Sequence, residues 1–414
     1  MLIKGASILQ NGELKKGLDI QIIDHKISAV GRELQAPERN DLIIDATGKL
    51  AIPGLVNGHT HLAMTLLRGY ADDMELMPWL QEKIWPIEAK LTASDIRAGV
   101  RLGCLELIRF GITCYNDMYY FMDETARATR EMGIRGVLSG VLFDMRPELL
   151  AEVEPFLRRW KDDPLIRPAV GPHAVYTCSE ETLLRAKELA QRYQAALHIH
   201  LSETRDEVDS FVNQSHMTPV EYLDALGLLG PRTAAAHCVW LTPSDIRTLA
   251  ELQVNVIHCP TSNLKLASGI SPVDRLLDAG ANVCLGTDGV SSNNNMSIFS
   301  EMKMAALVQK GNRGRPTILP AAQVWKMATQ NSYRAFGLDI GLAPGSLADL
   351  ALIDLSRPWF SPESNHLSHL VYSMAGGVDT TICNGRVLME NGIVPGEAEI
   401  LEDAQRSFER LTAS

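Results

Sequence analysis

An alternation of strand-like runs and amphipathic helices is the feature that most constrains the fold of this chain. The alternation repeats eight times between residues 55 and 344, and stretches with helical periodicity, such as 179–194 and 243–252, separate the runs. A β then α unit that repeats eight times predicts a closed parallel (β/α)8 barrel of the TIM type. The predicted strands are a run from Leu55, then 112–115, 135–141, 166–171, 196–201, 233–237, 255–259 and 282–286.

The two ends of the chain differ from this middle part, because apolar and polar residues alternate there with a period of two. We therefore expect residues 1–54 and 345–414 to form one composite β-sandwich domain around an inserted barrel domain of residues 55–344. We expect a terminal helix to pack on this β domain. The predicted strands are 2–9, 18–23, 26–30, 42–44, 348–354 and 379–392, with turns at Asn11-Gly12 and Asn384-Gly385, and the apolar face of the helix holds Leu401, Ala404, Phe408 and Leu411.

Charge and cysteine usage narrow the partners and the compartment. The formal net charge of -11 argues against nucleic-acid binding, because the release of counterions from phosphates requires clustered Lys and Arg. The 7 cysteines have no C-x-x-C spacing, which is typical of reduced core residues, so we expect a cytoplasmic protein. No signal peptide is indicated, and no apolar run approaches the length of a membrane span. The expected partners are a small-molecule substrate and, by analogy of size and fold, other copies of the chain.

Three histidines and an aspartate at predicted strand ends indicate a metal site. His59 and His61 project from one face because they are i and i+2 of a strand, although such a pair alone is more often a satisfied polar pair. His200 ends a later strand and Asp288 follows the last one, at the barrel edge where active sites lie. Three imidazoles and one carboxylate suit Zn²⁺, or less often Fe²⁺, with one position left for water.

Other histidines at this edge are expected to stay outside the metal shell. His198 shares a face with His200 but lies one layer deeper, which favours a hydrogen-bonded core histidine. The sequence leaves the direction of His258 open. A second metal in such barrels usually needs a bridging carboxylated lysine, and the segments 112–117 and 169–173 contain no lysine. We therefore expect a single metal ion.

Five motifs carry a resemblance that spans almost the whole chain. In order, they are Pro-Gly-Leu-Val-Asn-Gly-His-Thr-His, His-Leu-Ser-Glu, Ala-Ala-His-Cys-Val, Cys-Pro-Thr-Ser-Asn-Leu-Lys-Leu and Gly-Thr-Asp-Gly-Val-Ser-Ser-Asn-Asn. Together they resemble the amidohydrolase superfamily, and within it the 5'-methylthioadenosine/S-adenosylhomocysteine deaminase group, which includes 5'-deoxyadenosine deaminases. The resemblance implies a zinc-dependent aminohydrolase that converts the adenine ring of 5'-modified adenosines to the inosine analogue and ammonia.

The resemblance also implies roles for individual residues in catalysis. The implied metal ligands are His59, His61, His200 and Asp288. Asp288 would also take the proton of the attacking water, Glu203 would protonate the ring nitrogen next to the amine-bearing carbon, and His237 would steady the attacking oxygen.

For the substrate, the resemblance implies four contacts. Glu88 would contact the ribose hydroxyls, His173 and Glu203 would contact the nucleoside, and Trp79 would form a wall of the pocket. Without the resemblance, Glu88 is explained as an acid that the dipole favours at a helix start, and Trp79 is explained as a core residue.

One departure from the group's pattern affects substrate choice. Relatives active on S-adenosylhomocysteine tend to have an arginine where this chain has Gly140, and Arg146 is close enough in the sequence to substitute for it. Weaker binding of the amino-acid carboxylate of S-adenosylhomocysteine would favour substrates with smaller 5' groups. We therefore expect 5'-deoxyadenosine and methylthioadenosine to be turned over better than S-adenosylhomocysteine.

Proteins with other roles have similar sequences, and four of these roles are alternatives here. Guanine deaminases and triazine chlorohydrolases share the barrel and the ligands, but Glu88 and His173 favour a nucleoside. A non-catalytic scaffold of this ancestry typically lacks metal ligands, and all four are present here. A binuclear hydrolase of cyclic amides is disfavoured by the missing lysine.

Overall fold

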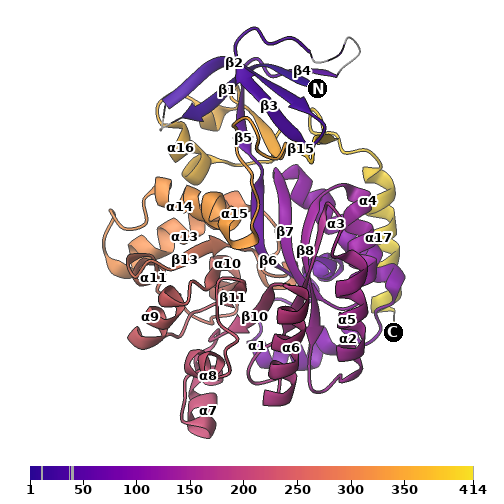
Figure 1. The fold of residues 1–414 in the computed structure, drawn as a ribbon, viewed down its shortest axis with the longest axis vertical. Coiled ribbons are helices and arrows are strands. Elements are labelled where there is room, and N and C mark those ends of the chain that lie inside the picture. Colours follow the sequence, from indigo (N-terminus) through magenta and orange to yellow (C-terminus); the bar gives the residue numbers. More distant parts are fainter. Residues whose placement is uncertain (11–12, 37, 39–41, 414) are drawn as a thin grey trace.

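The computed structural model describes residues 1–10, 13–36, 38 and 42–413, and its centre is the expected barrel (Figure 1). Eight strands form one sheet in the order β13-β12-β11-β10-β9-β8-β7-β6, and each neighbouring pair is parallel. The strands are β6 (Leu55–Thr60), β7 (Ile112–Tyr119), β8 (Arg135–Leu142), β9 (Ile166–Pro172), β10 (Leu197–Leu201), β11 (Thr233–His237), β12 (Asn255–His258) and β13 (Asn282–Leu285). The predicted runs match them closely, and the largest difference is at the end of β7.

Helices cover the outside of the barrel. The run Thr92-Ala-Ser-Asp has the spacing of a capping box, which predicts a helix start, and the structure confirms it at α3 (Ala93–Arg109). The Thr92 hydroxyl accepts from the backbone N–H of Asp95, and the Asp95 carboxylate accepts from the N–H of Thr92. Over the described ranges, none of the helices is both long and apolar enough to cross a bilayer. The helices are α3 (Ala93–Arg109), α4 (Met122–Met132), α5 (Glu148–Trp160), α6 (Glu180–Tyr193), α7 (Arg205–Ser215), α8 (Pro219–Ala225), α9 (Pro243–Glu251), α10 (Pro260–Lys265), α11 (Val273–Asp278), α12 (Val290–Asn293), α13 (Ile298–Arg313), α14 (Ala321–Ala328) and α15 (Gln330–Phe336).

A helical segment between β6 and α3 lies at the mouth of the barrel, and sequence periodicity did not indicate it. It consists of the 3-10 helix η1 (Leu62–Leu67), α1 (Leu76–Pro78), the π-helix η2 (Trp79–Ile84) and α2 (Trp85–Glu88). Its turns are too short and its helix types too mixed to show a 3.6-residue period. Single π-helical turns occur frequently at functional sites, and η2 begins at Trp79, which is predicted to form a wall of the substrate pocket.

The barrel closes between its first and last strands, and this seam positions two site residues. The amide of Asn57 donates to the Thr287 hydroxyl at 2.7 Å, and the N–H of Thr287 donates to Oδ1 of Asn57 at 3.0 Å. One step further, the N–H of Asp288 donates to the His59 carbonyl at 2.9 Å. Gly286 permits this approach, because a Cβ there would lie 2.7 Å from the His59 nitrogen. Closure of the barrel therefore places Asp288 next to His59.

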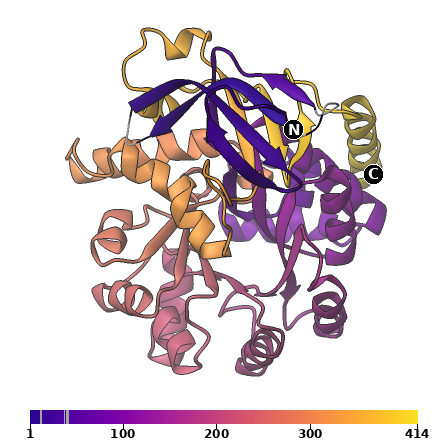
Figure 2. The ribbon, with the colours of Figure 1, turned by 45° about the horizontal axis from the view of Figure 1, so that its top comes forward.

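Both ends of the chain build a second sheet, as expected, and Figure 2 shows their strands side by side. Hydrogen bonds join these strands into one continuous mixed sheet in the order β16-β15-β14-β5-β1-β2-β3, with β4 on β1. The predicted turn at Asn384-Gly385 is confirmed, with φ of 53° and 74°, whereas Asn11-Gly12 lies outside the described residues. The strands are β1 (Leu2–Gln10), β2 (Glu13–Ile23), β3 (Lys26–Gly31), β4 (Ile43–Asp45), β5 (Lys49–Pro53), β14 (Leu350–Asp354), β15 (Thr380–Cys383) and β16 (Arg386–Met389). Between β14 and β15 lie η3 (Pro358–Phe360), α16 (His366–Ser368) and η4 (His369–Ser373).

A buried ion pair joins this sheet to the barrel. Arg135, at the start of β8, donates from Nε to Oδ2 of Asp349 at 2.7 Å and from Nη2 to Oδ1 at 3.1 Å. The two side chains are only 8% and 0% exposed. Asp349 immediately precedes β14, so the pair fixes the mixed sheet against the barrel.

The prediction for the terminal helix is wrong in one respect. Helix α17 (Glu397–Thr412) lies against α3 of the barrel rather than on the β domain (Figure 1). Arg101 of α3 donates to Asp403 at 2.8 Å and to Glu399 at 3.0 Å, which anchors the helix there. Its buried face includes Ile400, whereas Leu401 is 49% exposed, because one residue is a rotation of about 100° around a helix.

Candidate metal centre and active site

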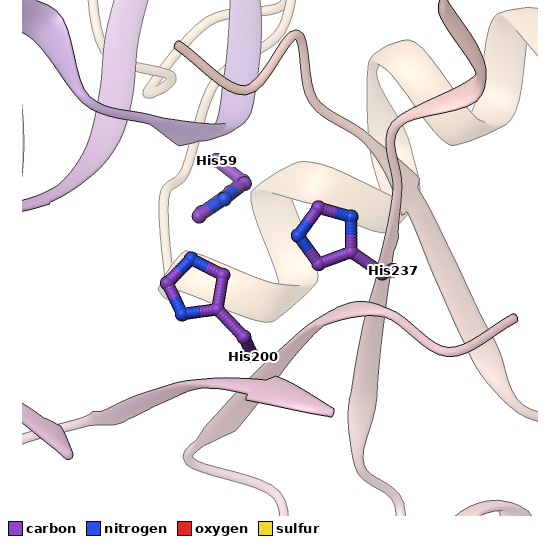
Figure 3. Close-up of side chains that lie close together, drawn as sticks. All are labelled: His59, His200 and His237. Carbon is purple, nitrogen blue, oxygen red and sulfur yellow. The ribbon is translucent and has the colours of Figure 1, made fainter. Parts of the chain in front are cut away.

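The four predicted metal ligands converge at the C-terminal mouth of the barrel. Nε2 of His59 and Nε2 of His61 each lie 3.3 Å from Oδ1 of Asp288, and Nε2 of His200 lies 3.3 Å from Nε2 of His61. His59 belongs to two donor sets whose atoms lie within 4.8 Å of one another, one with His61 and Asp288 and one with His200 and His237. Figure 3 shows the rings of His59, His200 and His237 turned toward a common space. The structure thus adds His237 to the same cluster of donors.

Each of these histidines is held through the ring nitrogen that faces away from the cluster. The outer partners of Nδ1 are Nε2 of His198 for His59 (2.8 Å), the Met118 carbonyl for His61 (2.7 Å), the His173 carbonyl for His200 (2.9 Å) and Oδ1 of Asn263 for His237 (2.8 Å). Partners of this kind fix the ring orientation and the tautomer of metal-binding histidines. The sequence-based view of His198 as a bonded core residue is confirmed.

The inner nitrogens fit a metal ion. Nε2 of His59 is buried and has no hydrogen-bond partner among the described residues. A buried polar atom without a partner costs free energy, and coordination of a cation would satisfy it. Imidazole nitrogens with one carboxylate oxygen are the donors that Zn²⁺ and Fe²⁺ accept. The arrangement therefore supports a metal site.

Burial and the Asp288 carboxylate set the electrostatics of the donors. Burial lowers the pKa of His59 to about 4 and that of His200 well below its ordinary value, so both rings are neutral at pH 7. Burial opposes ionisation of Asp288, but His59 and His61 outweigh it and hold the pKa of this carboxyl well below its ordinary value. Burial opposes protonation of His61, but the Asp288 carboxylate outweighs it and raises the pKa of this ring to about 9. A cation that binds there would therefore displace a proton from His61.

Glu203 and His237 face each other beside this cluster. Nε2 of His237 lies 3.7 Å from Oε2 of Glu203. The backbone has positive φ angles at the ends of both strands, +52° at Ser202, just before Glu203, and +73° at His237. These angles turn the chain so that the side chains of Glu203 and His237 lie at the mouth of the barrel. Non-glycine residues adopt such angles rarely, and they cluster at functional sites. Glu207 supports the turn, because its carboxylate accepts from the N–H groups of Ser202 at 3.2 Å and Glu203 at 2.8 Å.

A cavity of about 90 Å³ lies over the donor cluster. Its polar wall includes Glu203, His237 and Asp288, and its other walls include the predicted substrate residues Trp79, Glu88 and His173. The segment between β6 and α3 supplies Trp79 and Glu88, so it forms the outer wall. A largely apolar pocket with a few converging polar groups is the usual form of a small-molecule site.

Glu88 is held by a tyrosine that the sequence did not indicate. The hydroxyl of Tyr119, at the end of β7, donates to Oε1 of Glu88 at 2.6 Å. Burial raises the pKa of Glu88 to about 7, although the Tyr119 hydroxyl opposes the shift. Perturbed carboxyl groups in clefts are candidates for function. The second oxygen of Glu88 remains available to a ligand.

His173 and Trp79 also face the cavity. Burial lowers the pKa of His173 to about 3, so its ring is neutral, and its Nδ1 lies 3.0 Å from the Thr177 hydroxyl. This leaves Nε2 of His173 for a ligand. The indole N–H of Trp79 donates to the Ala71 carbonyl at 3.0 Å, which orients its ring as a wall.

Neither Arg146 nor Gly140 is among the described residues that line the cavity, although the charge of Arg146 acts on Glu88 in its wall. The Arg146 guanidinium donates to Glu148 at 2.9 Å and covers the Tyr120 ring at 4.9 Å. A Cβ at Gly140 would meet the Val153 side chain at 2.9 Å, so this position faces α5 rather than the barrel interior. An arginine there would not reach the cavity of its own chain.

His258 takes a place that the sequence left open. It is 1% exposed, and neither ring nitrogen has a hydrogen-bond partner among the described residues. Its neighbour Ile257 belongs to the barrel interior, since it approaches Gly58 and Gly286. Because side chains alternate along a strand, His258 points toward the helix layer. Burial lowers its pKa to about 3, so it stays neutral and outside the donor cluster.

Most of the chain is similar to known proteins. Residues 50–388 match the model of the amidohydrolase family. The chain is 70% identical over 411 residues, 99% of each chain, to the 5'-deoxyadenosine deaminase of Methanothrix thermoacetophila. It is 45% identical over 428 residues, 99% of this chain and 98% of the relative, to the 5-methylthioadenosine/S-adenosylhomocysteine deaminase of Pelotomaculum thermopropionicum.

A solved structure leads to the same assignment. An adenosine deaminase from Xanthomonas campestris with bound zinc superimposes with a TM-score of 0.94 at 35% identity, over 99% of this chain and 98% of that one. The strand order, the converging histidines and these matches all point one way: the chain belongs to the amidohydrolase family.

Proposed function

We propose that the protein is a metal-dependent aminohydrolase that converts the adenine ring of 5'-modified adenosines to the hypoxanthine ring of the inosine analogue, with release of ammonia. The 70% identity to a 5'-deoxyadenosine deaminase over 99% of both chains carries the proposal. The candidate substrates are 5'-deoxyadenosine, 5'-methylthioadenosine, S-adenosylhomocysteine and adenosine.

The metal in this proposal is one Zn²⁺ ion, with Fe²⁺ as the alternative. His59, His61, His200 and Asp288 would hold it, and the unpartnered Nε2 of His59 supports this assignment. When bound, the ion would supply the Lewis acidity that makes water a nucleophile near neutral pH. No lysine is among the described residues that line the cavity, which supports a single ion.

The chain's own residues handle the protons in this reaction. Asp288 accepts a proton from the attacking water, since its carboxyl is ionised at neutral pH, and gives this proton to the amine when the carbon–nitrogen bond breaks and ammonia leaves. The second proton of the water, lost as the carbonyl forms, restores the proton that Glu203 gives up. Glu203 delivers a proton to the ring nitrogen beside the amine-bearing carbon, and its oxygen Oε2 lies on the side of His237. His237 steadies the attacking oxygen through Nε2, because Nδ1 is held by Asn263.

The cavity walls favour a nucleoside over a free base. The free oxygen of Glu88 can accept from the ribose hydroxyls, whereas guanine or a triazine would leave this carboxylate without a partner. Nε2 of His173 can bond to the substrate, and the Trp79 ring would pack against the substrate. In this proposal, Arg146 binds the amino-acid carboxylate of S-adenosylhomocysteine only if its hydrogen bond to Glu148 breaks. Adenosines with small 5' groups are therefore the preferred substrates in this proposal. The alternative function is that of a free-base deaminase or a triazine chlorohydrolase.

An ultraviolet assay of zinc-loaded protein tests the proposal. The substrates are 5'-deoxyadenosine, methylthioadenosine, S-adenosylhomocysteine, adenosine, guanine and a triazine. We expect conversion of the 5'-modified adenosines, its loss in Glu203→Gln, and unchanged conversion in Glu152→Gln, an exposed glutamate outside the cavity. Activity on guanine or a triazine with none on any adenosine would refute the assignment of Glu88 and His173.

The division of the chain is part of the same proposal. Residues 55–344 would form the catalytic domain and residues 1–54 and 345–414 a supporting domain, because every proposed site residue lies on the barrel. A homo-oligomer and a cytoplasmic location remain predictions.

A further inference from the structure

One short segment makes hydrogen bonds to all three residues that handle protons in the proposed reaction. The bonds run from the Ser262 hydroxyl to Oδ2 of Asp288 (2.6 Å), from Nδ1 of His237 to Oδ1 of Asn263 (2.8 Å) and from the Ser268 hydroxyl to Oε1 of Glu203 (3.0 Å). The exposed fractions of Ser262, Asn263 and Ser268 are 0%, 0% and 4%, so water does not compete for these bonds.

The local fold explains how residues so close in the chain reach three different side chains. Ser262 and Asn263 are consecutive on α10, so they point about 100° apart and meet Asp288 and His237 on separate sides. After α10 ends, the chain reverses through Ala267 with φ +54° and Gly269 with φ +124°. This reversal brings Ser268 back toward Glu203.

The segment is itself held from several directions. The N–H of Ser268 donates to the Asn263 carbonyl at 2.8 Å, and the Trp240 indole donates to the Ser268 carbonyl at 2.6 Å. At the other end, the N–H of Thr261 donates to the buried carboxyl of Glu301 at 3.2 Å. Because its backbone is anchored on both sides, the segment can impose orientation on its partners.

The hydrogen bond from Ser268 makes the two carboxylate oxygens of Glu203 different. A hydroxyl that donates to Oε1 occupies that oxygen, and Oε2 is then the one that carries the proton, on the side of His237. Without this bond the carboxyl group could rotate about its last torsion, since terminal sp² torsions are broad and nearly two-fold. Loss of the bond would therefore reduce the fraction of enzyme in a reactive geometry, not the binding of substrate.

We infer that the segment from Ser262 to Ser268 is a single positioning element for the proton-handling groups, and that Ser268 acts on the chemical step through Glu203. This inference rests on the proposed function. It assigns Ser268 and Ser262 as positioning residues, since neither lines the wall where a nucleoside would contact it.

Single variants of the full-length, zinc-loaded protein test the inference. Ser268→Ala should lower kcat for 5'-deoxyadenosine by about ten- to a hundredfold with KM changed by less than about twofold, and Ser268→Thr should restore most of it. The matched control is Ser271→Ala. Ser271 is equally buried near the same turn, and its hydroxyl donates to the Cys238 carbonyl at 2.8 Å rather than to a proton-handling side chain, so kcat should be unchanged.

A second measurement does not depend on turnover. Ser262→Ala should weaken zinc binding, measured by competition with a chromophoric chelator, by about tenfold relative to Ser271→Ala. Asp288 then loses the nearer of the two serine hydroxyls that donate to Oδ2, and the Ser292 hydroxyl at 3.2 Å remains. Equal kcat in Ser268→Ala and Ser271→Ala, or equal zinc affinity in Ser262→Ala and Ser271→Ala, would overturn the inference. Absence of turnover by the wild-type protein would count against the proposed function, and the zinc measurement would then decide the inference.

Discussion

The carboxyl group of Glu88 should make substrate binding depend on pH near neutrality. Burial raises its pKa from the ordinary 4.5 to about 7, which corresponds to about 3 kcal/mol in favour of the protonated form. Only the ionised carboxylate can accept from both ribose hydroxyls. Binding of the substrate is therefore coupled to release of the proton from Glu88, and the affinity for the substrate falls as the pH drops through about 7.

The size of the effect follows from the fraction of Glu88 that is ionised. With a pKa of about 7, that fraction is about nine-tenths at pH 8 and about one-tenth at pH 6. We expect KM for 5'-deoxyadenosine to rise by about tenfold between pH 8 and pH 6, while kcat changes much less. The assay is initial-rate kinetics of ultraviolet absorbance in steps of pH.

Three variants separate Glu88 from other titrating groups. Glu88→Gln should have a high KM that no longer varies with pH. Tyr119→Phe removes a hydrogen bond that lowers the pKa of Glu88, so the rise in KM should move to higher pH, whereas Tyr120→Phe should not move it. A flat KM between pH 6 and pH 8 in the wild type, or the same profile in Glu88→Gln, would refute the reasoning.

Three further outcomes concern the metal, its support and the fold. Removal of metal with a chelator should abolish turnover, and a comparison of Zn²⁺ with Fe²⁺ in the recovered activity identifies the better metal. His198→Phe should weaken zinc binding by about 10- to 100-fold in a chelator titration, because His59 loses the partner that fixes its ring, and unchanged affinity would contradict that role. Arg135→Met leaves the buried carboxylate of Asp349 unpaired and should lower the free energy of unfolding by about 3–5 kcal/mol in denaturant melts. The double variant Arg135→Met/Asp349→Leu should recover much of this loss if the buried charge is its cause.

The sequence alone determined the parts of this protein that depend on local periodicity. The strand runs, the capped start of α3 at Thr92 and the placement of His59 and His61 on one face follow from spacings of two to four residues. The places of His200 and Asp288 at the ends of predicted strands then suggested that they belong to the same site, although no local spacing connects them to the first strand. Because a barrel places all strand ends at one edge, these residues could be expected to meet.

The tertiary structure decided what depends on contacts between distant segments. The bond from Tyr119 to Glu88 joins residues 31 positions apart, and the bond from Ser268 to Glu203 joins residues 65 positions apart. Neither partner carries a periodic signal, since a single hydroxyl in a loop looks like any other polar residue. The same reason explains why α17 packs on α3. Hydrogen bonds form where barrel closure and loop geometry bring atoms within 3 Å or so, and a linear pattern does not contain that distance.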